Sequence, residues 1–132
     1  MKIQVILPFV LVGLMSFQCN KHHKFCTQEF VMHGTALVNP LGEQVAYESY
    51  AVIHESTGDT VITEKSYPFE AEYFNQIIVL TDNELYYTTS SATKFLLHVV
   101  IDSLNQVSGK FVFNNDGCHV RKLGGPDEIV VN

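Results

Sequence analysis

The chain has 132 residues, of which 46% are hydrophobic and 17% charged, and its 8 Lys and Arg against 14 Asp and Glu give a formal net charge of −6. This length fits one domain, or one domain behind a leader. An acidic chain without a long Lys/Arg run lacks the basic patch needed to bind nucleic-acid phosphates, and the modest charged fraction excludes a disordered acidic tail.

The first eighteen residues carry one positive charge, Lys2, followed by a mostly apolar run from Ile3 to Phe17. This order is typical of a secretory signal peptide, and the run is shorter than the roughly 20 apolar residues of a membrane-spanning helix. We therefore expect residues 1–18 to direct export and to be removed. The alternative is a buried first helix or strand of the fold, which Pro8 and the lone leading Lys2 disfavour.

Cys19 stands directly behind this run, and the segment resembles a bacterial lipoprotein signal, in which that cysteine carries the lipid. Such signals usually have a small residue before the cysteine, whereas Gln18 and Phe17 precede it here. Ordinary cleavage, with Cys19 lost or left free, is therefore the alternative. We expect Cys19 to be the lipid anchor to a membrane of the bacterial cell envelope, because several acyl chains together hold a protein stably. Residues 19–25 would be the anchor and a polar tether.

Residues 26–132 are expected to form one domain of short strands. Apolar and polar side chains alternate with a period of two in most of it, and no stretch shows a convincing helical period. Turn-forming residues at 39–42, 56–59 and 114–117 separate the strands, the last with the Asp-Gly pair of a tight hairpin. Seven to nine such strands predict an all-β sandwich. Strands are expected within residues 29–38, 44–54, 60–64, 84–89, 94–102, 106–113, 118–122 and 128–131, and residues 69–74 with 76–81 are expected to add one or two more.

The three cysteines divide into one and two. If Cys19 carries a lipid, Cys26 and Cys118 remain, and paired thiols of an exported chain form disulfides in an oxidising compartment. A bridge between them would close a loop of about 92 residues and stabilise the fold by roughly 4 kcal/mol in the chain-entropy model. The rival is a catalytic pair of Cys118 with His119, which we disfavour because adjacent strand residues point to opposite faces.

Residues 38–45, Val-Asn-Pro-Leu-Gly-Glu-Gln-Val, join two predicted strands through a polar-Gly turn. With the lipoprotein-like leader and the cysteine before the first strand, they resemble the opening of transthyretin-like (prealbumin-like, carboxypeptidase regulatory-like) domains. Residues 116–126 are similar to the endings of small uncharacterised lipoproteins of Gram-negative bacteria. The resemblance implies a single Greek-key β-sandwich of about seven strands, prealbumin-like or immunoglobulin-like, over residues 26–132. It implies no catalytic residue.

Few side chains form patterns that carry chemistry. Glu70 and Glu72 would share one face of a strand. A solvent-exposed strand face explains them more simply than a pair of carboxylates for glycoside hydrolysis. The acidic and amide residues at 82–84 and 114–117 do not have EF-hand spacing, and no Gly-x-Ser-x-Gly or phosphate-binding glycine loop occurs. We expect no enzyme, no cofactor and no metal site. Four histidines of the domain occur singly: His33, His54, His98 and His119.

Tyr86 and Tyr87, with Thr and Ser residues behind them, are the candidate ligand-binding residues, because exposed tyrosines stack on sugars or anchor protein partners. The chain is thus predicted to be an exported, lipid-anchored envelope protein with a non-enzymatic binding or structural role. The alternatives are a carbohydrate- or peptide-binding accessory module and an inhibitor of an envelope-targeting enzyme. An enzyme would instead require a polar cleft with convergent titratable groups.

Overall fold

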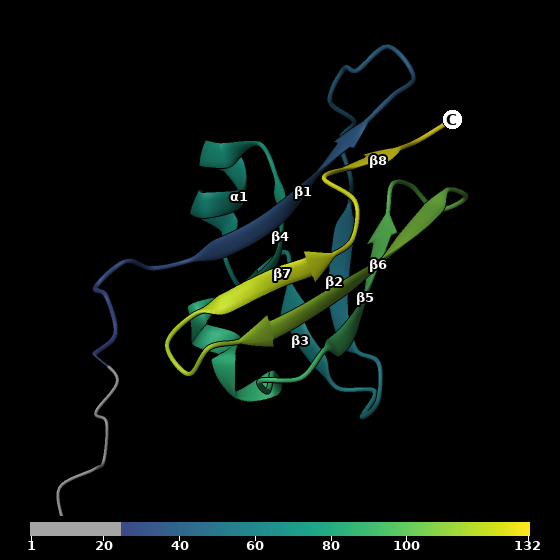
Figure 1. Cartoon of the computed structure of the whole chain (residues 1–132). Coiled ribbons are helices and arrows are strands. Elements are labelled where there is room, and N and C mark those ends of the chain that lie inside the picture. The colour runs from purple at the N-terminus through teal and green to yellow at the C-terminus, as the bar shows by residue number, and fades with distance from the viewer. Residues whose placement is uncertain (1–24) are drawn as a thin grey trace, which may run out of the picture.

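The computed structural model describes residues 25–132, which form two β-sheets (Figure 1). The smaller sheet has the strand order β4-β1-β8 and the larger one β3-β2-β5-β6-β7. This arrangement confirms the predicted all-β sandwich, with eight strands in the described part of the chain. They are β1 (Met32–Val38), β2 (Ser49–His54), β3 (Thr60–Thr63), β4 (Ile77–Thr81), β5 (Thr93–Val100), β6 (Gln106–Asn115), β7 (Val120–Gly124) and β8 (Glu128–Val130).

The core follows from alternation along the central strands. In β5, Phe95, Leu97 and Val99 are fully buried, while the residues between them are only half-buried. Phe95 pairs across the sheet with Phe111 of β6, and both rings pack with other buried aromatic and aliphatic side chains. Each such side chain stabilises the fold by about 1.5–3 kcal/mol relative to an exposed one.

The smaller sheet joins the two ends of the domain. β1 pairs antiparallel with β4 along one edge and parallel with β8 along the other. β1 and β8 accordingly lie side by side, although they are the first and last strands of the domain (Figure 1).

Residues 69–74 were predicted to be a strand, and this is wrong: Pro68–Phe74 is the helix α1. Pro68 favours the first turn of a helix, since its φ is already helical, and Asn75 ends the helix in the left-handed conformation. Only Ala71 of α1 is buried, so no apolar period marked the helix. Residues two apart on a helix point about 200° apart, and Glu70 and Glu72 therefore do not share a strand face.

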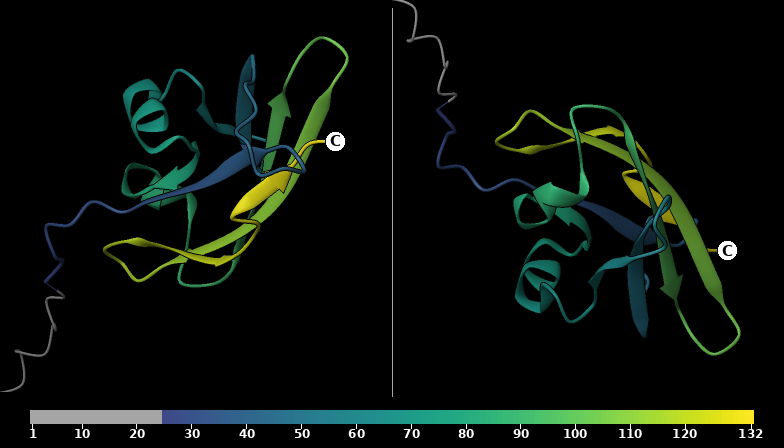
Figure 2. Two further views of the ribbon diagram at one scale, coloured as in Figure 1. Left: turned by 90° about the horizontal axis from the view of Figure 1, so that it is seen from above. Right: turned by 90° about the horizontal axis from the view of Figure 1, so that it is seen from below.

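Residues 84–89 were also predicted to be a strand, but Asp82–Tyr87 forms the 3-10 helix η1. Thr81 and Glu84 form its capping box: the Thr81 hydroxyl accepts from the Asn83 N–H, and the Glu84 carboxylate accepts from the Thr81 N–H. This Thr-x-x-Glu signal was present in the sequence and outweighs the strand propensity of the two tyrosines. Figure 2 shows η1 and α1 gathered at one end of the sandwich, away from the β5–β6 turn.

The three predicted turns are confirmed. Gly42, Gly58 and Gly117 adopt the positive φ that each turn requires. β6 and β7 form the predicted hairpin. One detail differs, because β7 begins at Val120 and Cys118 lies in the hairpin loop instead of the strand.

Candidate functional site

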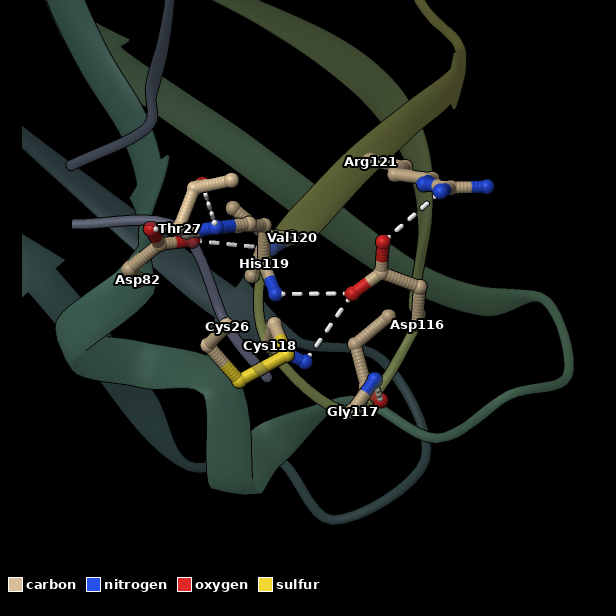
Figure 3. The surroundings of a disulfide bond; sticks show 10 residues. Cys26, Thr27, Asp82, Asp116, Gly117, Cys118, His119, Val120 and Arg121 are labelled. Carbon is tan, nitrogen blue, oxygen red and sulfur yellow. Dashed lines mark hydrogen bonds and ion pairs between the residues drawn. A yellow bond between two sulfur atoms is a disulfide. The ribbon is translucent and has the colours of Figure 1, made fainter. Parts of the chain in front are cut away.

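A disulfide joins Cys26 to Cys118, with 5.3 Å between their Cα atoms, and confirms the predicted pair (Figure 3). It ties the segment before β1 to the loop between β6 and β7. The Cys118 sulfur is therefore not a free thiol nucleophile. Residues 1–18 and the proposed lipid anchor Cys19 lie outside the described residues.

Beside the disulfide, His119 is bonded on both sides of its ring (Figure 3). Its Nδ1 donates to Oδ2 of Asp82 at 2.6 Å, since a carboxylate can only accept, and its Nε2 lies 2.8 Å from the Thr27 hydroxyl. Both carboxylate oxygens of Asp82 also accept backbone N–H groups, from Val31 at 2.9 Å and Val120 at 2.9 Å. We call Thr27, His119 and Asp82 the His119 network.

The environment of Asp82 favours its ionised form. Burial by itself would raise the pKa of Asp82, but the hydrogen bonds from His119 and from the two backbone N–H groups outweigh it. The pKa of Asp82 therefore lies below its ordinary value.

A hydroxyl, an imidazole and a carboxylate in this order are also the parts of a hydrolytic triad. Such a triad works with hydrogen-bond donors aimed at the substrate oxygen, which backbone N–H groups or side chains supply. Here the amides of Cys118 and His119 already donate to Asp116, and that of Val120 donates to Asp82. These three amides are thus engaged within the protein, and the His119 network joins the segment before β1, η1 and the β6–β7 loop. Sequence reasoning missed it because its members are far apart in the chain.

The structure also forms a groove beside the predicted residue Tyr87, with a volume of about 420 Å³. It lies between the turn that follows β2 and the start of β5. Sequence reasoning did not identify the residues across from the tyrosine, since only the fold brings them near. We call this the Tyr87 groove; its lining includes His54, Glu55, Ser56, Tyr87, Thr89, Thr93 and Lys94.

A series of rings connects the groove to the core. Tyr86 is 76% exposed, and its ring is tilted by 35° against the ring of Tyr87, with 4.2 Å between ring centroids. Tyr87 lies 6.2 Å from His54, whose ring contacts Phe95 edge-on at 5.3 Å. The ring of His54 is further held through Nδ1, which lies 3.1 Å from the Thr57 hydroxyl. The structure thus places Tyr87 in the wall of the groove, while Tyr86 contacts Tyr87 without lining the groove itself, and their part in binding stays a prediction.

Other predicted site residues remain apart. Within residues 25–132, no three His, Cys, Asp or Glu side chains lie close enough to hold a metal ion. His33 packs against Phe113 at 5.4 Å, and Asp116 of the 114–117 turn pairs with Arg121 at 2.7 Å. No helix in the described range is long and apolar enough to cross a membrane.

Comparisons of the chain with protein-family models, with curated proteins and with solved structures find no significant match. The function proposed below therefore depends on the residues of this chain alone.

Proposed function

We propose that the chain is an exported protein of the bacterial cell envelope, held at a membrane by a lipid on Cys19, which binds a ligand without catalysing a reaction. The Cys26–Cys118 disulfide supports export, because such bonds persist in oxidising compartments. The two-sheet fold and the turn at Asn39–Gly42 after β1 also support a Greek-key, transthyretin-like domain behind the anchor.

The observation that carries the binding role is the Tyr87 groove. Its volume of about 420 Å³ falls in the range of small-ligand sites, about 300–1,000 Å³. Glu55 and Lys94 give its lining one negative and one positive charge, and the other polar groups include the hydroxyls of Ser56, Thr89 and Thr93. Hydroxyl and charged groups beside the half-buried Tyr87 ring suit a neutral ligand that has hydroxyls on its edges and an apolar face. A neutral saccharide has this chemistry, and it is the ligand we propose.

The anchor is tested by the mass of the mature protein from its native membrane fraction. We expect an acylated N-terminal Cys19 together with the loss of roughly 2 Da that a disulfide produces. Replacing Cys19→Ser should release the protein into the soluble envelope fraction, because the acyl chains supply the membrane affinity. A soluble wild-type product cleaved at another position would contradict the anchor while leaving the groove untouched.

The groove is tested by titrating the protein with neutral oligosaccharides of two to four units, containing glucose, xylose or N-acetylglucosamine, and following backbone amide shifts by NMR. We expect shifts at 54–57 and 86–94. Tyr86→Ala should weaken binding about three- to tenfold, since an aromatic contact is worth about 0.5–1.5 kcal/mol. The saccharide signals should stay unchanged overnight, as expected without catalysis.

Tyr73→Ala is the matched control, because Tyr73 is 83% exposed but lies on α1, outside the groove. It should bind saccharides like the wild type. Equal weakening by both variants, or shifts confined to other residues, would contradict a saccharide site at Tyr87. Shifts of the same residues by unstructured peptides alone would favour the peptide-binding alternative.

A further inference from the structure

A second surface that the proposed function does not use is formed by α1. Phe69 is 81% exposed, Tyr73 83% and Phe74 51%, although aromatic rings of this size usually bury most of their area. Together with Glu70 and Glu72 they line one shallow hollow, which we call the α1 surface. Contiguous exposed apolar groups of this kind mark interaction sites on soluble domains.

The rings of the α1 surface are arranged by the helix and not by the core. Phe69 and Tyr73 stand one turn apart, so they lie on the same side of α1. Tyr73 and Phe74 meet nearly at right angles, with 87° between their planes and 5.0 Å between their centroids. The two rings make a corner whose faces are open to a partner. Only Ala71 joins α1 to the buried cluster.

The charge of the α1 surface is negative. Glu70 and Glu72 line the same hollow as the rings, and the sequence from Ser66 to Thr81 contains no Lys, Arg or His. Within the described part of the chain, neither carboxylate has a basic group at ion-pair distance. The surface therefore offers aromatic faces and two carboxylates to whatever binds it.

Charge excludes two possible occupants. A second copy docked about a two-fold axis would bring the same patch onto itself and place four carboxylates together. A membrane with anionic headgroups would repel the pair in the same way. Cations, by contrast, gain from both features, because Lys and Arg bind aromatic faces and form charge-assisted hydrogen bonds with carboxylates.

We propose that the α1 surface binds a cationic segment of a partner protein in which Lys or Arg alternates with apolar side chains. The apolar groups would cover Phe69 and Phe74, and the cations would pair with Glu70 and Glu72. This site is separate from the Tyr87 groove, since the two linings share no residue.

The test uses the mature protein and three synthetic twelve-residue peptides, which alternate Leu with Arg, Leu with Glu, and Gly with Arg. We expect the Leu-Arg peptide to bind at least tenfold more tightly than either of the others by isothermal titration calorimetry. Two double variants should each weaken the binding of this peptide about tenfold. One is Phe69→Ser with Tyr73→Ser, and the other is Glu70→Gln with Glu72→Gln. The exposed side chains make these variants compatible with folding, and an unchanged midpoint of urea unfolding verifies it.

Glu48→Gln with Glu128→Gln is the control, because it removes the same charge from exposed positions outside the α1 surface. It should change the affinity less than twofold, as should Tyr86→Ala, whose ring lies against Tyr87 of the groove. Equal loss in the control would overturn the proposal, since the peptide would then respond to net charge alone. Equally tight binding of the Leu-Glu or Gly-Arg peptide would also overturn it. The same holds if the wild type self-associates or binds lipid vesicles and the Phe69→Ser and Tyr73→Ser double variant does not, because the α1 surface would then serve that other occupant.

Discussion

Replacing Asp82→Ala is expected to lower the free energy of unfolding by about 3 kcal/mol in urea denaturation at neutral pH. The substitution removes the acceptor of two backbone N–H groups and of the His119 ring, and unsatisfied buried donors cost about 1–3 kcal/mol each in such settings. The Asp82 side chain is 12% exposed, so water restores only part of this loss. Asp82→Asn should lose less, because one carbonyl oxygen still accepts.

Asp102→Ala is the matched control for this substitution. Asp102 also accepts two backbone N–H groups, from Leu104 at 2.8 Å and Asn105 at 3.0 Å. The hydrogen bond from the Asn105 side chain is the main cause of its lowered pKa, and the backbone bonds add to it. It lies in an exposed turn, where water replaces the lost bonds, and we expect a loss below about 1 kcal/mol. Equal losses of unfolding free energy in the two variants would show that the hydrogen bonds of the His119 network stabilise the fold no more than those of an exposed turn.

The pH dependence follows from the lowered pKa of Asp82. A carboxyl whose pKa is lower in the folded state contributes its full stability above its unfolded pKa of about 3.9 and loses it as the pH falls through the folded pKa. The wild type should therefore lose more stability than Asp82→Asn between about pH 5 and pH 2, and their unfolding free energies should converge at the acid end. Parallel curves over this range would contradict the assignment.

Removing the disulfide is expected to lower the free energy of unfolding by about 2–4 kcal/mol. The bond joins residues 92 apart, and in the chain-entropy model a loop of this length accounts for about 4 kcal/mol. The measured loss of unfolding free energy should be somewhat smaller, because the released segment before β1 also gains conformational freedom in the folded state. Cys26→Ser with Cys118→Ser, compared with the wild type in urea, measures the difference.

Two further samples identify the cause of the loss. The wild type reduced with dithiothreitol should match the double variant, since both lack the same bond. Thr27→Val, which removes only the hydroxyl beside His119, should cost less than about 1 kcal/mol because Thr27 is exposed. A double variant as stable as the oxidised wild type would show that the disulfide does not restrict the unfolded chain.

The contrast between predicted and observed elements has a physical basis. The sandwich was predictable because half-buried strands leave a period of two in the sequence. The turns were predictable because glycine, here Gly42, Gly58 and Gly117, readily adopts the positive φ that they require. The helix α1 was not, because its rings face solvent and its buried side is a single alanine. The capping box at Thr81 and Glu84 was the available signal for η1, and aromatic strand propensity hid it.

The features of the candidate sites also differ in whether the sequence alone could predict them. The disulfide could be predicted by counting cysteines, which needs no geometry. The bond between Asp82 and His119, and the place of His54 beside Tyr87, depend on which strands become neighbours. A single sequence contains no local signal for such pairs, because tertiary packing alone brings them together.

The parallel pairing of β1 with β8 has a consequence for biosynthesis. β1 cannot gain its second neighbour until residues 128–130 have been translated, so the smaller sheet stays incomplete on a growing chain. Contacts this distant in sequence form late and slowly. For the exported protein proposed above, such a delay would keep the chain unfolded until it reaches a translocation channel. The smaller sheet would then be completed after passage, in the oxidising compartment where Cys26 and Cys118 pair.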